Sequence, residues 1–392
     1  MIVVPLAVHS PRAVREVLRA HGWDEVRADA AAGGVGPLAF HLTGLPESAL
    51  LVLVRHAGQL GLEILTGEDW ALLAGSRAKL GALARPWVVP PELGDLAEQL
   101  GRALPESPPP IWETARGSIA VDRPVIMGIL NVTPDSFSDG GQFTTVDAAV
   151  AHADRLLDEG ATLLDIGGES TRPGGPEPVA ESEELRRVIP VIDAIGKRHP
   201  SVPLSVDTVK AGVARAALSA GAAVVNDVSA FRLDPEMASV VRGAGAGVVL
   251  MHSRGDVSTM ATLNQADYNG DVVATVLAEL RAALEAAVAV GVAPERIVLD
   301  PGFGFAKSAE HNMQLCDRLS ALLALGRPIL VGPSRKRFLG SITGREILER
   351  DAATAAACLI AYEEGARLFR VHNPAAVRDA LAVAHAIRGG VR

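Results

Sequence analysis

Short apolar runs alternate with longer segments of helical periodicity along the chain from residue 125 onward. The runs occupy residues 125–131, 162–168, 203–208, 223–228, 247–252, 296–301, 328–334 and 368–372. The segments between them are rich in Ala, Leu, Glu and Arg, and include residues 146–159, 181–197, 272–290 and 352–364. This alternation predicts buried strands joined by crossover helices, and therefore a parallel sheet.

Eight strand-helix units in this stretch predict an α/β fold of the (β/α)8, or TIM barrel, type. An open, doubly wound parallel sheet of similar size is the structural alternative. The barrel is favoured because no glycine-rich dinucleotide fingerprint follows the first apolar run.

The first hundred residues show a less regular pattern and predict a small α+β module over residues 1–104. The candidate helices are residues 11–21 and 93–103, and the candidate strands are residues 39–42 and 50–54. The module has no cluster of His, Asp, Glu or Cys of the kind that carries catalysis. A packing, lid or oligomerisation role is therefore favoured for it.

A proline-rich stretch that begins at Pro105 resists both helix and central strand. We interpret residues 105–117 as a linker, followed by the barrel over residues 118–392. All four tryptophans precede residue 115 and both tyrosines follow it, which is typical of two modules with different cores.

Composition and charge exclude several classes of protein. Hydrophobic residues make up 48% of the 392 residues and charged residues 21%, as in soluble globular chains. The formal net charge of −9 gives no electrostatic reason to bind nucleic acid. The two cysteines lack zinc or disulfide spacing, and neither a secretory leader nor a membrane span is apparent. We expect a cytoplasmic protein without nucleic-acid or membrane partners.

Polar side chains lie at the carboxyl end of nearly every predicted strand or directly after it, where a (β/α)8 barrel places its active site. The principal ones are Asn131, Asp207, Asn226, Asp227, His252, Asp300, Ser334, Arg335, Lys336, Arg370 and His372. A single polar strand end is usually structural, but this many together predict a functional site.

The basic members of this set indicate an anionic ligand. Lys336, Arg370 and His372 follow the last two predicted strands, where barrels of this type often bind phosphate. The amide oxygen of Asn131 suits Mg²⁺, a hard cation that commonly shares its ligands with phosphate oxygens. An asparagine that holds the following turn is the structural alternative.

The middle strands indicate a second ligand group. Asp207, Asn226 and Asp300 offer acceptors and a donor to a flat, donor-rich heterocycle. Asp165 and Asp227 lie close to these candidates, and we interpret both as polar groups of the barrel core. Two long loops rich in glycine and proline follow the first two predicted strands and are typical of active-site covers.

Two long motifs resemble the signatures of the dihydropteroate synthases. Residues 127–141 read MGILNVTPDSFSDGG and residues 165–174 read DIGGESTRPG. Shorter matches follow in order at residues 205–208, 226–228, 251–252, 299–305, 332–336 and 370–372. The similarity covers essentially all of residues 118–392, whereas the N-terminal module resembles, much more weakly, an extension of some longer members.

The resemblance implies condensation of 6-hydroxymethyl-7,8-dihydropterin diphosphate with 4-aminobenzoate to 7,8-dihydropteroate and diphosphate, in folate biosynthesis. It implies that the pterin is bound by Asp207, Asn226, Met251, Asp300 and Lys336. The diphosphate would be bound by Asn131 with Mg²⁺, Thr171, Arg370 and His372. The 4-aminobenzoate would lie among Phe137, Thr171, Arg172, Pro173, Phe305 and Ser334.

The resemblance also implies how the reaction proceeds. Asp207, Lys336, Arg370 and His372 would be the catalytic residues. Negative charge that develops on the leaving diphosphate would be stabilised by Mg²⁺, Arg370 and His372, which favours a dissociative path. The family further implies a homodimer formed through barrel helices, and inhibition by sulfonamides.

Four positions depart from the family pattern. Ala306 stands where a glycine is usual, Ser253 and Arg254 follow the histidine of the fifth run, and Asn373 replaces an aspartate after His372. None of these positions carries a direct role above. The shape of the aminobenzoate pocket near Phe305 is the property that Ala306 puts in question.

Three other functions compete with this interpretation. A pterin-dependent methyltransferase would share the Asp/Asn/Asp pterin site but would not need a diphosphate clamp. A catalytically silent pterin-binding paralogue would act as a binding or regulatory module, and loss of a loop or clamp residue would support it. A synthase that takes another arylamine is the third alternative.

Overall fold

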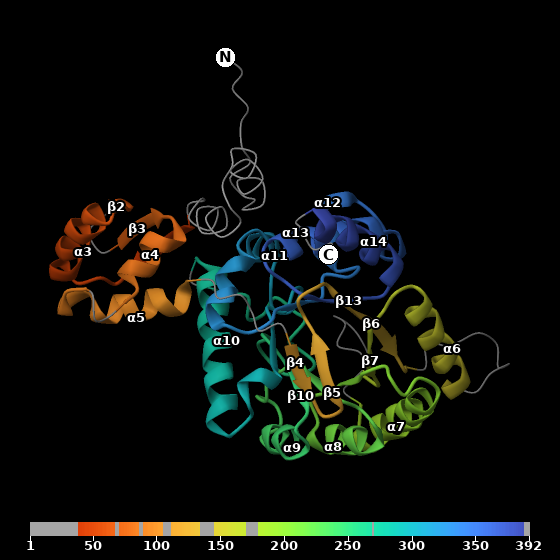
Figure 1. The fold of residues 1–392 in the computed structure, drawn as a ribbon. Coiled ribbons are helices and arrows are strands. Elements are labelled where there is room, and N and C mark those ends of the chain that lie inside the picture. Colours follow the sequence, from red (N-terminus) through yellow and green to blue (C-terminus); the bar gives the residue numbers. More distant parts are fainter. Residues whose placement is uncertain are drawn as a thin grey trace, which may run out of the picture. The chain divides into compact units, whose positions relative to one another are not determined.

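The computed structural model describes residues 38–66, 70–85, 89–104, 111–133, 145–169, 179–268 and 270–387 (Figure 1). Its contacts divide the chain into two compact units. One comprises Met1–Glu106 with Ile387–Arg392, and the other comprises Ser107–Ala386. Each unit has its own apolar core, so each is considered by itself.

The described part of the first unit combines an antiparallel sheet with helices. The sheet has the order β1-β3-β2, with β1 at Leu38–Thr43, β2 at Glu63–Thr66 and β3 at Trp70–Gly75. The helices are α3 (Glu47–Gln59), α4 (Arg77–Leu83), a 3-10 turn (Pro91–Leu93) and α5 (Gly94–Ala103). The predicted strand at residues 39–42 and helix at residues 93–103 are confirmed; residues 11–21 lie outside the described ranges.

The strand predicted at residues 50–54 is wrong, because these residues belong to helix α3. A short apolar run does not by itself distinguish a strand from a buried helix face. The buried side chains of α3 are Ala49, Leu50, Leu53 and Ala57, which recur at the spacing of one helix face. Leu51 and Val54 of the same run are exposed.

The second unit is a barrel of eight parallel strands in the order β11-β10-β9-β8-β7-β6-β13-β12. A parallel bridge between Leu299 and Ile329 joins the first strand of this order to the chain just before the last, and so closes the barrel. The predicted (β/α)8 fold is therefore confirmed, and the open doubly wound sheet is excluded. The strands are β6 (Val125–Asn131), β7 (Leu163–Gly167), β8 (Leu204–Asp207), β9 (Val224–Asp227), β10 (Gly247–Met251), β11 (Ile297–Asp300), β12 (Leu330–Val331) and β13 (Leu368–Val371).

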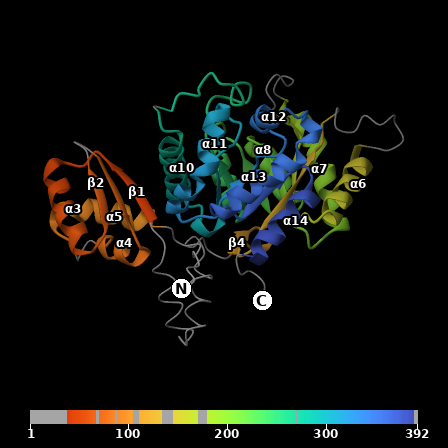
Figure 2. The same cartoon turned by 90° about the horizontal axis from the view of Figure 1, so that it is seen from above.

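Helices surround these strands (Figures 1 and 2). They are α6 (Thr145–Asp158), α7 (Glu181–Arg198), α8 (Ala211–Ala220), α9 (Met237–Ala244), α10 (Val272–Ala289), α11 (Ala309–Asp317), α12 (Arg337–Thr343), α13 (Asp351–Glu363) and α14 (Pro374–His385). The strands are apolar along almost their whole length because one face packs on the helices and the other on the barrel interior. Strand β12 is shorter than the predicted run at residues 328–334. Pro328 and Pro333, near the two ends of that run, have no N–H to donate to a neighbouring strand.

A β-hairpin closes the end of the barrel where the strands begin. It consists of β4 (Ile111–Thr114) and β5 (Gly117–Ala120), so part of the predicted linker belongs to this hairpin. Trp112 is fully buried among interior side chains that include Val125 and Met127, and its Nε1–H donates to the carbonyl of Arg296 at 2.8 Å. Because this end is plugged, ligands have access to the barrel from the opposite end.

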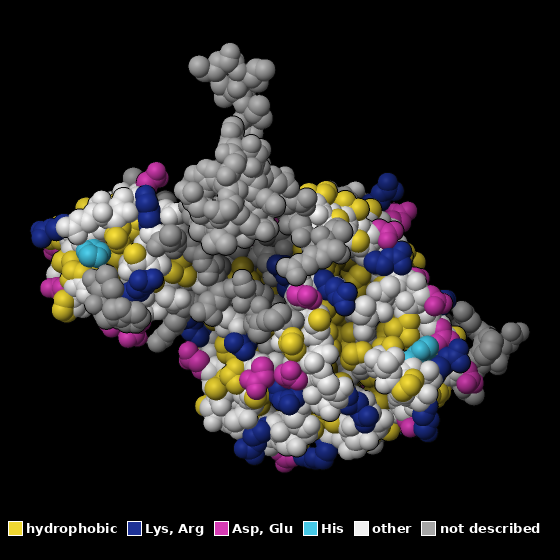
Figure 3. Space-filling view, in the orientation of Figure 1, with side chains coloured by type: hydrophobic (Ala, Val, Ile, Leu, Met, Phe, Trp, Pro, Cys, Tyr) yellow, Lys and Arg dark blue, Asp and Glu magenta, His cyan; other side chains and the backbone are white. Residues whose placement is uncertain are grey.

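The surface of the barrel unit mixes both signs of charge. On the face in Figure 3, dark blue and magenta side chains alternate, with hydrophobic atoms between them. Within the described ranges, no helix is both long and apolar enough to cross a membrane.

Candidate active site at the carboxyl ends of the barrel strands

The predicted pterin residues come from adjacent strands of the barrel. Asp207 is level with Asn226 of the neighbouring strand, and Met251 is level with Asp300 of the next pair. Each of these four residues ends its strand or lies one residue before its end. The structure therefore brings these four predicted residues to one end of the barrel.

Arg370 links two carboxylates at this end. Its Nε donates to Asp165 Oδ2 at 2.6 Å and its terminal nitrogen to Asp207 Oδ2 at 2.7 Å. The amide nitrogen of Asn226 donates to the same oxygen of Asp165 at 2.9 Å. Arg370 and Asp207 each remain about one-fifth exposed, whereas Asp165 is fully buried. The open side of this group is thus formed by Arg370 and Asp207.

Asp165 is fully buried inside β7, as expected for a polar group of the barrel core. It orients Arg370 and Asn226, although its carboxylate is closed off from solvent. Its signal in the sequence was a carboxylate inside an apolar strand, two residues before the strand ends. The assignment of Asp227 to the structure is confirmed, because its carboxylate accepts N–H bonds from Ser229 and Phe231 of the following turn.

Burial shifts the titration of the charged groups at this end. It raises the pKa of Asp207 to about 7 against the opposing effect of Arg370, and the pKa of Asp300 to about 6. Burial lowers the pKa of Lys336 to about 8. For Arg370 burial acts to lower the pKa, but Asp165 and Asp207 outweigh it and the net shift is upward. Small changes in pH near neutrality therefore change the charge of this site.

Lys336 lies against the loop that follows β11. Its ammonium group donates to the carbonyl of Phe303 and is 4.2 Å from the centroid of the Phe305 ring. Gly304 has a φ of 77°, and a Cβ there would lie 2.7 Å from Lys336 Cδ. The glycine is needed for both the backbone conformation and this close approach. Phe305 and Met251 belong to one small apolar cluster beside the charged groups.

Ser334 connects the loops that follow the last two strands. Its hydroxyl is 2.9 Å from His372 Nδ1 and accepts the backbone N–H of His372 at 3.1 Å. Arg335 turns away from this group, and its guanidinium forms two hydrogen bonds to Asp351 of α13, the shorter at 2.8 Å. Ser334, Lys336, Arg370 and His372 are therefore brought together, while Arg335 is structural.

Asn131 ends β6 beside Gly167, and no hydrogen bond ties its amide to another described side chain. No group of three or more His, Cys, Asp or Glu residues suited to a metal occurs in the described ranges. A single amide oxygen fits Mg²⁺ that keeps several waters and binds substrate phosphates, and does not fit a metal that needs a complete protein cage. The residues present are thus compatible with a magnesium ion that arrives with the diphosphate.

Four predicted contacts of the aminobenzoate, Phe137, Thr171, Arg172 and Pro173, lie outside the described residues. Two described residues on either side of residues 170–178 are in contact, because Glu169 Oε1 accepts the N–H of Val179 at 2.7 Å. Lys210 binds Glu169 and the buried Glu184, both at 2.6 Å. The pattern of the sequence did not identify this anchor.

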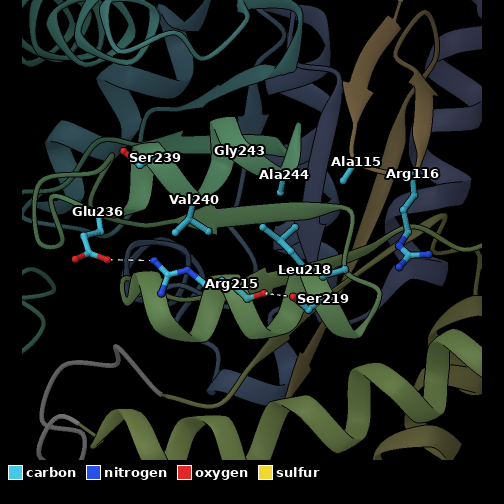
Figure 4. Close-up of a pocket in the computed structure, with 11 residues that line it drawn as sticks. Ala115, Arg116, Arg215, Leu218, Ser219, Glu236, Ser239, Val240, Gly243 and Ala244 are labelled. Atoms are coloured by element: carbon cyan, nitrogen blue, oxygen red, sulfur yellow. Dashed lines mark hydrogen bonds and ion pairs between the residues drawn. The ribbon is translucent and has the colours of Figure 1, made fainter.

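A surface groove of about 770 Å³ lies elsewhere on the barrel unit, between α8 and α9 (Figure 4). Arg215 and Glu236 form an ion pair of 3.1 Å in it, and Arg116 of the hairpin turn contributes to its lining. None of the predicted site residues lines this groove. The chemistry therefore concentrates at the strand ends and not in this groove.

Comparison with known proteins agrees with this geometry. The family model described as "Pterin binding enzyme" matches residues 127–372. A dihydropteroate synthase of Synechocystis is 46% identical over 68% of this chain and 90% of its own length, and that of Bacillus subtilis is 44% identical over 64% and 84%.

Solved structures give the same result. The chain is similar to Xanthomonas albilineans dihydropteroate synthase with 4-aminobenzoic acid, at 50% identity and a TM-score of 0.67, over 71% of this chain and 98% of that one. The same enzyme in complex with 7,8-dihydropteroate is 47% identical with a TM-score of 0.65, over 71% and 99%. The chain therefore belongs to the pterin-binding enzyme family, in the branch of the dihydropteroate synthases.

Proposed function

We propose that the chain condenses 6-hydroxymethyl-7,8-dihydropterin diphosphate with 4-aminobenzoate to form 7,8-dihydropteroate and diphosphate, a transferase step of folate biosynthesis. The observation that carries this proposal is the group of Asp165, Asp207, Asn226 and Arg370, which puts acceptors for a heterocycle beside a cation for an anionic leaving group. The relatives and solved structures named above support it.

The pterin fits the acceptors at the ends of β8, β9 and β11. A pterin edge is rich in N–H donors, and the carboxylates of Asp207 and Asp300 accept such bonds, while the Asn226 carbonyl accepts and its amide is already used by Asp165. Met251 at the end of β10 and Lys336 just before α12 would contact the ring. Selectivity for a pterin follows because buried acceptors left without donors would cost binding free energy.

The diphosphate fits Arg370, His372 and Asn131. When bound through Asn131 and the phosphate oxygens, Mg²⁺ would neutralise charge on the leaving group. Arg370 already lies at the open side of its two carboxylates, so it is oriented before the substrate arrives. Thr171 stays a prediction as a further contact of the diphosphate.

The 4-aminobenzoate fits between Phe305 and Ser334. The Phe305 ring offers an apolar face, and the Ser334 hydroxyl offers a polar group next to His372. Phe137, Thr171, Arg172 and Pro173 stay predictions as the remaining contacts. As the bond from the pterin methylene to the diphosphate breaks, the Asp207 carboxylate stabilises the positive charge that develops on the pterin. The arylamine nitrogen then bonds to the methylene carbon, and its surplus proton passes to the released diphosphate or to water.

Three further properties remain predictions from the sequence: a separate module over residues 1–104, a homodimer, and a cytoplasmic location. None of them enters the reaction proposed above.

The test is formation of dihydropteroate by the purified full-length chain, supplied with the pterin diphosphate, 4-aminobenzoate and Mg²⁺. Arg370→Ala should lower kcat/KM at least a hundredfold, because it removes charge stabilisation from the transition state and leaves Asp165 buried without its cation. Arg215→Ala, in the exposed pair of the surface groove, is the matched control and should keep full activity. A wild-type chain that binds pterin but forms no product would favour the silent paralogue or another arylamine.

A further inference from the structure

A buried lysine outside the predicted site braces one of its loops. Lys307 is 3% exposed, and its ammonium group donates to the carbonyls of Gly302 and Phe305 at 3.1 and 3.0 Å. Its third hydrogen bond goes to His252 Nδ1 at 2.9 Å. All three partners are neutral acceptors, so the cation is buried without a carboxylate bound to it.

His252 connects Lys307 to helix α10. Its Nε2 lies 2.8 Å from Glu279 Oε2, and burial together with Lys307 lowers the pKa of the imidazole to about 4. Because Nδ1 accepts from an ammonium group, the ring proton resides on Nε2 and is donated to Glu279. The tautomer of the neutral imidazole is therefore fixed by its two partners.

A second line of contacts returns from α10 to the same loop. Arg254 binds Glu279 and two backbone carbonyls, and its guanidinium carbon is 4.3 Å from the centroid of the Tyr268 ring. The Tyr268 hydroxyl donates to the carbonyl of Ala306 at 3.0 Å. These contacts form a closed ring around the loop at residues 302–306, made by Lys307, His252, Glu279, Arg254 and Tyr268.

This ring of contacts stabilises a loop whose backbone conformation is unfavourable. Gly302, Gly304 and Ala306 all have positive φ, and the value of 49° at Ala306 is unfavourable for a residue with a Cβ. The N–H of Ala306 also donates to the carbonyl of Met260 at 2.8 Å. This loop presents the Phe305 ring, and its Phe303 carbonyl accepts from Lys336.

Packing alone does not account for this lysine. Burial lowers the pKa of Lys307 to about 7, which means that the charged form is held there at a cost in stability. An apolar side chain of the same length would fill the space without that cost. What it would not supply are the bonds to the Gly302 and Phe305 carbonyls.

We propose that Lys307 is a positioning residue of the active site, which fixes Phe305 against Lys336 through the loop at residues 302–306 and so sets the binding of the arylamine substrate. The proposal rests on the proposed function for the identity of that substrate. Lys307 touches neither substrate nor the reacting atoms; it acts through the loop. Asp207 and Asn226 belong to strands β8 and β9, whereas Asp300 accepts the N–H of Gly302 at 2.7 Å and Lys336 donates to the Phe303 carbonyl, so the pterin contacts depend on this brace only in part.

The variant that tests this is Lys307→Met, which replaces the lysine by an unbranched apolar side chain one atom shorter and removes its three donors. We expect the KM for 4-aminobenzoate to rise about tenfold, the KM for the pterin diphosphate to rise by a smaller factor of about three, and kcat to change less than threefold. Tyr268→Phe removes only the bond to the Ala306 carbonyl, and should raise the KM for 4-aminobenzoate by a smaller factor. Lys197→Met, on the exposed face of α7, is the control and should change nothing.

Amide hydrogen exchange provides a readout that does not require turnover. The peptide that spans residues 302–306 should exchange at least tenfold faster in Lys307→Met, while peptides from β7 and α7 keep their wild-type rates. If Lys307→Met does not fold, Tyr268→Phe carries both measurements. If the wild-type chain forms no dihydropteroate, the proposed function fails, and exchange still tests the brace.

Two results would overturn the proposal. One is wild-type KM and exchange in a folded Lys307→Met chain. The other is an equal loss in both KM values and in kcat together with faster exchange throughout the barrel, which would make Lys307 a residue of general stability only.

Discussion

At the scale of single residues, the site is built from charges that share partners. Arg370 donates hydrogen bonds to two carboxylates, and Asp165 accepts hydrogen bonds from both Arg370 and Asn226. One oxygen of Asp165 and the hydroxyl of Ser205 are buried without a partner in the described part of the chain. Buried polar atoms of this kind are normally satisfied, so these two are exceptions among the buried polar groups near the site.

The raised pKa values of Asp207 and Asp300 predict how ligand binding depends on pH. Both groups bind a proton as the pH falls through about 7 and about 6, and a protonated carboxyl is a poorer acceptor for pterin N–H groups. The Kd of 7,8-dihydropteroate, measured by calorimetric titration, should therefore rise at least tenfold from pH 7.5 to pH 5. Asp300→Asn should bind weakly at both values and show a flatter profile. A Kd that stays constant over this range would contradict the assignment.

The positive φ of Ala306 predicts an unusual response to glycine. Replacing alanine with glycine inside a helix costs about 1 kcal/mol. At Ala306 the left-handed backbone is itself unfavourable for alanine by roughly 1–2 kcal/mol, so its relief offsets the lost methyl group and the greater entropy of the unfolded chain. Ala306→Gly should therefore keep the free energy of unfolding within about 0.5 kcal/mol of wild type, whereas Ala356→Gly in α13 should lower it by about 1 kcal/mol. Urea unfolding of both variants measures the difference.

At the scale of elements, the hairpin of β4 and β5 and the strand ends divide the barrel into a structural end and a chemical end. The hairpin buries Trp112 under the interior side chains, and Arg296 donates to the carbonyl of Thr114 at 2.9 Å. Polar side chains with shifted pKa values gather at the other end. Stability and catalysis should therefore respond to mutation separately.

Trp112→Ala tests that separation. Loss of a fully buried tryptophan and of its hydrogen bond should lower the free energy of unfolding by about 3–5 kcal/mol. The kcat of the molecules that remain folded should stay near the wild-type value, because Trp112 lies at the closed end. Ile111→Ala, at a neighbouring side chain that is 45% exposed, should change stability by less than about 1 kcal/mol. A loss of kcat without a loss of stability would show that the two ends are coupled.

The elements also show what the sequence could and could not predict. Strands of the barrel were predictable because burial on both faces makes them apolar runs, and their polar ends marked the site. Residues 50–54 were mistaken for a strand because the run was too short to show its period. The contacts of Asp165 and Lys307 were not predictable because their partners come from other parts of the chain, 205 residues away for Arg370 and 55 for His252.

At the scale of the whole molecule, the two units have separate cores and only one of them carries the predicted site. The core of the first unit is formed by its own helices and sheet, around Leu53, Leu73 and Leu93. Cores that are not shared need not unfold together.

Scanning calorimetry should accordingly show two transitions for the full chain. A ligand that binds only one unit stabilises that unit alone, by about 2.7 kcal/mol at a hundred times its Kd. Dihydropteroate should therefore raise the midpoint of the barrel transition and leave the other transition in place. A single transition that moves as one with the ligand would mean that the units unfold cooperatively.

The barrel also has a seam. Where β11 meets the chain before β12, closure depends on the single bridge between Leu299 and Ile329, in which the N–H of Leu299 donates to the carbonyl of Pro328, whereas the other neighbouring strands share longer ladders. Asp300 follows the seam on one side, and Lys336 lies beyond it on the other. A pterin bound to both residues would connect the two sides of this closure. Substrate binding would then reduce local opening of the barrel at this joint, and the hydrogen-exchange rate of the Leu299 amide would fall.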